Sequence, residues 1–275
     1  MKLYRTQIGL IAETDGVFHA LTDLDLDVIF RQQDPRHFLE RVVPTARVTS
    51  EAATADLLPP IQNQEVWAAG VTYLRSKHAR MDESDKAGGG DFYDRVYEAE
   101  RPELFFKATG HRVAGPGGCI RIRKDAQWSV PEPELALAVS ASGRIFGYTV
   151  GNDVSARDIE GENPLYLPQA KVYDRSCALG PALLIPEQPP GAATCIRLKI
   201  ERDGRTVFEG ATTLASMKRS PSELVSFLFR ENTFPNGCFL LTGTGIVPED
   251  SFSLQSGDVV HIKIDPIGTL KNHVA

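Results

Sequence analysis

The segment Val130–Val139 reads VPEPELALAV, and its apolar run LALAV predicts a buried strand. Side chains two residues apart in a strand point to the same face, so Glu132 and Glu134 would lie side by side. Two neighbouring carboxylates repel, and a hard divalent cation between them would remove that cost. The prolines at 131 and 133 carry no N–H, which favours an edge or a rim of the sheet. Two glutamates that face water are the alternative that spacing alone leaves open.

Short β-like runs separated by turn residues surround this segment, among them LFFKAT, RIFGYTV, ALLIP, CIRLKIER, CFLLTGT and VVHIKID. Helical signals are fewer. Ser220 and Asp34 are candidate N-caps, each followed by a proline in the first turn. The pattern predicts a mainly β (α+β) fold, a barrel or folded roll. Residues 1–60 are expected to form a small α/β domain, because the double proline in LLPPIQNQEV is typical of a linker. Residues 61–275 would form the larger domain.

Composition excludes several classes of protein. The chain has 275 residues and a net charge of −6, which argues against nucleic-acid binding. No run approaches 18 apolar residues, and the first residues show no long apolar stretch, so neither a membrane span nor a signal peptide is expected. The four cysteines form no C-x-x-C pair, which favours reduced thiols in a cytoplasmic protein.

Polar residues follow two further segments in a way that suggests a site. RIFGYTVGNDVSARD ends a predicted strand with Asp153 and Arg157, and the loop after it leads to Lys171. Three oxygen ligands from neighbouring strand ends would leave open positions at a metal for water and substrate. A lysine beside them would act as a cation or as a base. The polar stretch at about 74–100 contains three consecutive glycines, which predicts a mobile lid.

Several motifs occur in the order found in one known family: EPELALAV, GYTVGNDVSARD, QAKVYD with CALGPALL, LLTGTG, LQSGDVVHIKI and IGTLKNHV. On these motifs, residues 66 to 275 resemble the fumarylacetoacetate hydrolase family. The resemblance implies a mixed β-roll around Mg²⁺ or Mn²⁺, with Ca²⁺ a further possibility in a crystal. It also implies a homodimer and a small-molecule substrate that is a 2-oxo acid or a 1,3-dicarbonyl compound.

The same resemblance assigns roles to individual residues. The metal ligands of the family fall on Glu132, Glu134 and Asp153, and the lysine near the metal falls on Lys171. The residues implied to hold substrate are Arg157, Gly243 and Thr244.

Two departures bear on the reaction. Family hydrolases commonly carry a lid histidine shortly after the first-strand tyrosine, whereas here Ser76 stands three residues after Tyr73 and His78 five after. Glu160 stands where the family often has a glutamine, and a carboxyl group there would be able to shuttle a proton.

The runs GVTYLRS, FYDRVYEAERPELFFK and EGENPLYLPQAKVYD resemble the subgroup that dehydrates 2-keto-3-deoxy sugar acids such as 2-keto-3-deoxy-arabinonate. That resemblance implies a metal-stabilised enolate and a semialdehyde product. Lys171 and Glu160 would carry the two proton transfers, with neither assigned as base or acid. The candidates for contacting substrate are Tyr73, Arg75, Ser76 and, with less support, Lys107.

Two other functions remain open at this point. One is a C–C hydrolase of an acylpyruvate or 2,4-diketo acid, or an oxaloacetate-type decarboxylase, with His78 recruited from the lid. The other is a binding protein without activity, which is disfavoured because the metal-ligand and lysine positions are all occupied.

Overall fold

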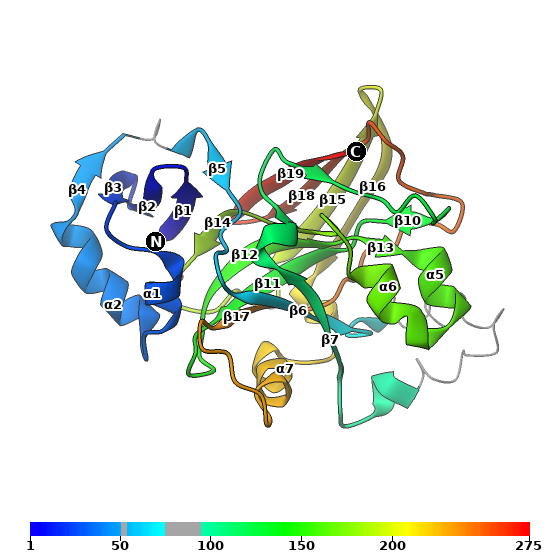
Figure 1. Ribbon diagram of the computed structural model, residues 1–275, viewed down its shortest axis with the longest axis horizontal. Coiled ribbons are helices and arrows are strands. Elements are labelled where there is room, and N and C mark those ends of the chain that lie inside the picture. The colour runs from blue at the N-terminus through cyan, green and yellow to red at the C-terminus, as the bar shows by residue number, and fades with distance from the viewer. Residues whose placement is uncertain (51–53, 75–94) are drawn as a thin grey trace.

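A computed structural model describes residues 1–50, 54–74 and 95–275 (Figure 1). Within these residues the chain is mostly strands with few helices, and the sheets do not close into a barrel. The predicted mainly β fold is therefore confirmed, with the folded roll as its form.

Two sheets make up most of the molecule. In the described part of the chain the larger sheet has 12 strands, in the path β4 (Arg47–Thr49), β3 (Val17–Leu21), β2 (Gly9–Thr14), β1 (Lys2–Thr6), β14 (Cys177–Leu184), β12 (Ile145–Asp153), β11 (Pro133–Val139), β17 (Cys238–Leu241), β6 (Glu65–Gly70) and β7 (Glu103–Thr109), with β5 (Leu57–Leu58) beside β1 and β8 (Val113–Ala114) beside β14. The second sheet runs β16 (Arg205–Thr213), β15 (Cys195–Arg202), β18 (Val259–Ile264), β19 (Gly268–Val274) and β9 (Cys119–Ile120). A short pair joins β10 (Ser129–Val130) to β13 (Ser155–Ala156).

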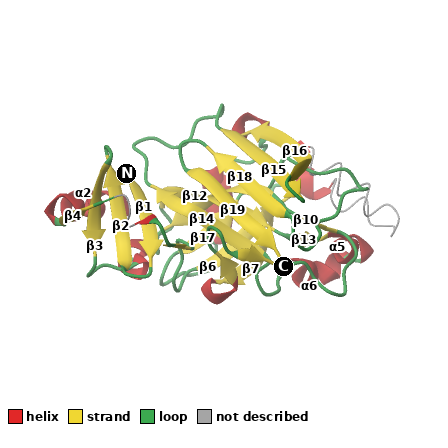
Figure 2. Ribbon diagram, turned by 90° about the horizontal axis from the view of Figure 1, so that it is seen from above, coloured by secondary structure: helices red, strands yellow, loops and turns green. Residues whose placement is uncertain are grey.

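The helices lie around these sheets: α1 (Leu26–Phe30), α2 (Pro35–Val42), α5 (Arg157–Glu162), α6 (Leu167–Lys171) and α7 (Pro221–Leu228). Both predicted helix starts are confirmed. Asp34 accepts a hydrogen bond from the N–H of His37, and Ser220 accepts one from the N–H of Glu223. Figure 2 shows α5 and α6 together at one end of the molecule and β1 to β4 at the other. No helix within the described ranges is long and apolar enough to cross a membrane.

β11 is buried on both faces, which explains its unbroken apolar run. Leu135, Leu137 and Val139 pack in the core that also contains residues of the second sheet. Ala136 and Ala138 pack in the core on the opposite face, with residues of α1 and α2. β11 also lies between β12 and β17, so it is an interior strand and not an edge. Pro133 is its first residue, at the rim of the sheet, where a missing N–H is tolerated.

The first residues of the chain continue the larger sheet. β1 pairs antiparallel with β14, with Lys2 opposite Leu184 and Leu3 opposite Leu183. The predicted linker contacts α1 through hydrogen bonds. The side chains of Asn63 and Gln64 in the linker donate to the carboxylate of Asp27 in α1. The domain boundary near residue 60 remains a prediction, as does the lid, most of which lies outside the described residues.

Candidate active site

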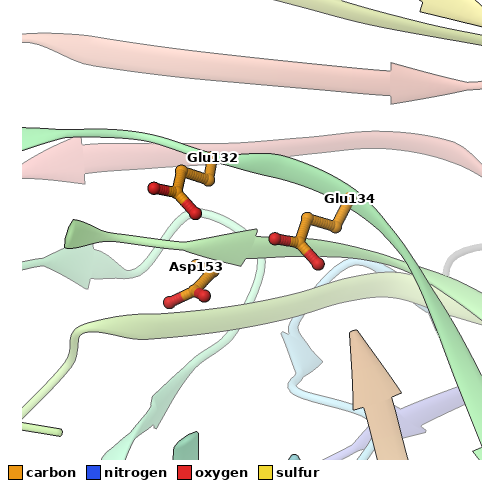
Figure 3. A group of neighbouring side chains, drawn as sticks. All are labelled: Glu132, Glu134 and Asp153. Carbon is orange, nitrogen blue, oxygen red and sulfur yellow. The ribbon is translucent and has the colours of Figure 1, made fainter. Parts of the chain in front are cut away.

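The three predicted metal ligands meet at the end of the larger sheet. One carboxylate oxygen from each of Glu132, Glu134 and Asp153 lies within 4.8 Å of the other two (Figure 3). The register explains the meeting: β11 and β12 run antiparallel with Glu134 opposite Gly151, and the N–H of Asp153 donates to the carbonyl of Glu132. All three residues are at most 4% exposed, so the alternative of glutamates facing water is wrong.

Cationic side chains surround these carboxylates. Lys171 Nζ, at the end of α6, donates to Glu132 Oε2 at 2.8 Å and to Asp153 Oδ2 at 3.2 Å. Arg157 Nη2, at the start of α5, donates to Glu132 Oε1 at 3.1 Å. Lys107 Nζ lies 2.5 Å from Asp153 Oδ1. Each of these cations is also nearly inaccessible to solvent.

The surroundings of Glu134 shift the pKa of its carboxyl group. Burial raises the pKa of its carboxyl well above the usual value, and the negative charges of Asp153 and Glu132 raise it further. Lys171 and the N–H of Gly243, which donates to Glu134 Oε2 at 2.5 Å, oppose this shift. A divalent cation among the three carboxylates would favour their ionised forms.

The donor set and the size of the pocket fit such an ion. The predicted ligands all offer carboxylate oxygens, which hard divalent cations prefer. The enclosed space beside them is about 10 Å³, roughly one water-sized sphere. The pocket is lined by Ala69, Gly70, Val71, Phe105, Glu132, Glu134, Asp153, Arg157, Lys171, Gly243 and Thr244. The residues present could therefore hold a metal ion.

Glu160 joins the site from α5. It is 1% exposed, and its Oε2 lies 4.0 Å from Lys171 Nζ. The hydroxyl of Ser155 donates to the same Oε2 at 2.6 Å. The two residues predicted to move protons are thus neighbours, although they come from different helices.

The predicted substrate residues that the structure describes divide into two groups, those that line the carboxylate pocket, Arg157 among them, and Tyr73. Gly243 and Thr244 line the carboxylate pocket, and Gly243 has a φ of +88° where an added Cβ would collide with Thr72 Oγ1. Tyr73 is 1% exposed, and burial followed by the charge of Glu134 raises the pKa of its hydroxyl. Arg75 and Ser76 lie outside the described residues, as does His78.

A cavity larger than the carboxylate pocket adjoins Tyr73. Among the described residues, Tyr73 and Gly245 line a cavity of about 660 Å³. Gly245 directly follows Thr244, which lines the carboxylate pocket. A cavity of this size is within the usual range for small-molecule sites.

Sequence reasoning missed two features of the site. Lys107, considered from the sequence only as a weaker candidate for substrate contact, instead contacts the predicted metal ligand Asp153, and its run LFFKAT gave no signal for that contact. Ser155 contacts Glu160, and its place in the motif SARD was the available signal.

Comparison with known proteins gives the family. The model of the fumarylacetoacetate hydrolase C-terminal domain matches residues 65–275. The chain belongs to this family. A probable 2-keto-3-deoxyxylonate dehydratase of Haloferax volcanii is 46% identical, over 96% of this chain and 94% of the relative. The 2-dehydro-3-deoxy-D-arabinonate dehydratase of Saccharolobus solfataricus is 45% identical, over 77% of this chain and 72% of the relative.

Solved structures agree with these relatives. A 2-keto-3-deoxyarabinonate dehydratase has a TM-score of 0.89 and 37% identity, and the match covers 100% of this chain and 99% of the other. A structure of a 2-keto-3-deoxy-D-arabinonate dehydratase in complex with magnesium and 2,5-dioxopentanoate matches with a TM-score of 0.86, also at 37% identity, over 100% of this chain and 98% of the other. The resemblance to this family and to its dehydratase subgroup, predicted from the motifs, is confirmed.

Proposed function

We propose that this protein is a divalent-metal-dependent hydro-lyase. Its substrate is a 2-keto-3-deoxy pentonate such as 2-keto-3-deoxy-arabinonate, and its product is the semialdehyde 2,5-dioxopentanoate. The observation that carries the proposal is the buried cluster of three carboxylates with Lys171 and Glu160 at its side. Relatives with 45% identity or more that are dehydratases of such acids support it.

Glu132, Glu134 and Asp153 would hold the metal, which we take to be Mg²⁺ because a structural relative was solved with magnesium. When bound, the ion supplies Lewis acidity to the carboxylate and C2 carbonyl of a 2-oxo acid, which makes the C3 protons more acidic. The chain itself keeps bulk water away from these groups, since the three residues that would hold the metal are at most 4% exposed. A dry site strengthens every charge interaction within it.

Lys171 and Glu160 carry the proton transfers. One takes a proton from C3, and the other gives a proton to the C4 hydroxyl, which leaves as water. Their separation of 4.0 Å lets both reach adjacent carbons of one substrate. The Ser155 hydroxyl holds the Glu160 carboxyl group in place. Subsequent hydrogen shifts along the carbon chain convert the unsaturated alcohol to the aldehyde.

The substrate is held by groups around the same pocket. Thr244, Gly243 and Arg157 line it, and Arg157 also donates a hydrogen bond to Glu132. Tyr73 keeps its hydroxyl proton because its pKa is raised, so it offers a neutral donor to a substrate oxygen. Arg75 and Ser76 complete the proposed set. We also propose a cytoplasmic homodimer, which agrees with the family resemblance and with four cysteines that are all free.

The test is a panel of 2-keto-3-deoxypentonate stereoisomers incubated with the purified protein and Mg²⁺, with products identified by mass. Loss of water that depends on the metal is the expected result. Failure to dehydrate any stereoisomer would contradict the proposal. Oxaloacetate and an acylpyruvate belong in the same panel, because loss of carbon dioxide or C–C cleavage would favour the decarboxylase or hydrolase function instead.

A further inference from the structure

Lys107 is a buried lysine that the proposed reaction does not use. It is 0% exposed, and its Nζ lies 2.5 Å from Asp153 Oδ1. The same Nζ donates to the carbonyl of Lys171 at 2.6 Å and to the carbonyl of Val154 at 3.0 Å. A buried ammonium group is costly unless it is paired and hydrogen-bonded, and here three oxygens meet that need.

These contacts connect the two elements that carry the site. Asp153 ends β12, and Lys171 ends α6. Lys107 contacts the side chain of Asp153 and the backbone carbonyl of Lys171. It is also absent from the pocket-lining residues of the described chain, whereas Lys171 is among them. Lys107 therefore lies behind the site, which argues against the direct substrate contact considered from the sequence.

A local irregularity of β7 accounts for this placement. Val66 of β6 pairs with Ala108, but the next residue, Trp67, pairs with Phe106. Lys107 is thus the extra residue of a β-bulge. Bulges turn side chains away from their regular direction and are frequent next to active sites. The backbone at this position is shaped to direct Lys107 toward the cluster.

We propose that Lys107 is a positioning residue for the dehydration. It holds Oδ1 of Asp153, so that Oδ2 is presented to Lys171 and the pocket, and it anchors the backbone of Lys171 so that Nζ lies between Glu132 and Asp153. The part of this proposal that concerns turnover rests on the proposed function.

Loss of the Lys107 charge should lower turnover without weakening metal binding. Asp153 would then have Lys171 as its nearest cation, and Lys171 Nζ would move toward Oδ1 and away from Glu132. A displacement of about 1 Å costs roughly 100-fold in rate at a well-aligned site. A carboxylate released from a lysine is at the same time more available to a divalent ion. Turnover should fall while metal affinity is retained.

The experiment uses Lys107→Met and Lys107→Gln, because glutamine removes the charge but keeps a donor for the two carbonyls. Ser176→Ala is the matched control: its hydroxyl also donates to the carbonyl of Lys171, at 2.8 Å, and the change leaves the Asp153 pair intact. For each protein, kcat and KM for water loss are measured with Mg²⁺. Mn²⁺ binding to the substrate-free protein is followed by calorimetry and by electron paramagnetic resonance.

We expect kcat to fall roughly 100-fold in both Lys107 variants with KM little changed. The Mn²⁺ Kd should be no weaker than in the parent, and the Mn²⁺ spectrum should change because Asp153 is no longer held. Ser176→Ala should keep the parent Mn²⁺ spectrum and lose much less kcat than either Lys107 variant, because Lys107 still holds both Asp153 and the carbonyl of Lys171. Any of four outcomes would overturn the proposal. The first two are a parent-like kcat in both Lys107 variants and a loss of metal binding that parallels the loss of turnover. The other two are an equal loss of kcat in Ser176→Ala and failure of both Lys107 variants to fold.

The spectrum separates this inference from the proposed function. A parent that dehydrates no acid, together with an altered Mn²⁺ spectrum in the Lys107 variants, refutes the proposed function and leaves the positioning of Asp153 supported. An active parent with parent-like spectra in both variants refutes only the role of Lys107.

Discussion

Lys171→Met should separate proton transfer from metal binding. Methionine has nearly the length of lysine but carries neither charge nor N–H donors. The change removes the donors to Glu132 at 2.8 Å and to Asp153 at 3.2 Å, together with the cation 4.0 Å from Glu160. The carboxylates that would hold the metal are left in place.

Two magnitudes follow from this geometry. A positioned acid or base contributes about 10²–10⁴-fold to a rate, so a loss of about 10³-fold in kcat, or about 4 kcal/mol, is expected. Removal of one partner from a buried ion pair costs about 3–5 kcal/mol of folding stability. For a chain of this size that lowers Tm by at least about 6 °C in the metal-free protein. A bound divalent ion replaces the missing cation, so the variant should gain more stability from Mg²⁺ than the parent does.

The assay combines kcat for water loss with thermal unfolding in EDTA and in excess Mg²⁺. Lys218→Met is a suitable control, because that lysine lies outside the carboxylate cluster and is paired with Glu98. The reasoning would be refuted by a Lys171→Met protein with kcat within about tenfold of the parent, given the rate contribution expected of an acid or base. An unchanged Tm in the metal-free variant would refute the stability part.

Glu132→Gln removes one proposed ligand, so it should weaken Mn²⁺ binding by roughly 100-fold or more and abolish turnover. Calorimetry measures the binding, and product mass measures the turnover. The control Glu162→Gln, at an exposed position of α5, should change neither. Glu160→Gln should lower kcat by about 10²–10⁴-fold with metal affinity retained, and loss of Mn²⁺ binding in this variant would count against its role as a proton carrier. Folding raises the pKa of the Glu134 carboxyl, so the folded metal-free protein binds the carboxyl proton more tightly than the unfolded chain does. The resulting stabilisation of the fold is complete below the ordinary pKa near 4.5 and is lost as pH rises through the raised pKa. Glu134→Gln should therefore flatten the fall in Tm with rising pH in EDTA, and an unchanged pH profile would contradict the assignment.

Local sequence was sufficient for several parts of the structure. The helix starts at Asp34 and Ser220 depend on a side-chain oxygen and an N–H three residues away, so a short window contains the whole interaction. The E-x-E spacing placed Glu132 and Glu134 side by side for the same reason, since strand geometry fixes the direction of side chains two residues apart. Whether those glutamates face water or lie buried beside Asp153 depends on residues outside that short window.

The sequence by itself determined the fold class, the family and the residues that could serve as ligands, because strand periodicity and motif order are written along the chain. Only the tertiary structure decided which groups surround those ligands. The Nζ of Lys107 and the carbonyl of Lys171 are 64 residues apart in the chain, yet they meet because β7 carries a bulge and α6 ends beside it. Contacts of this kind depend on strand register and on how separate elements pack, and no local pattern encodes either.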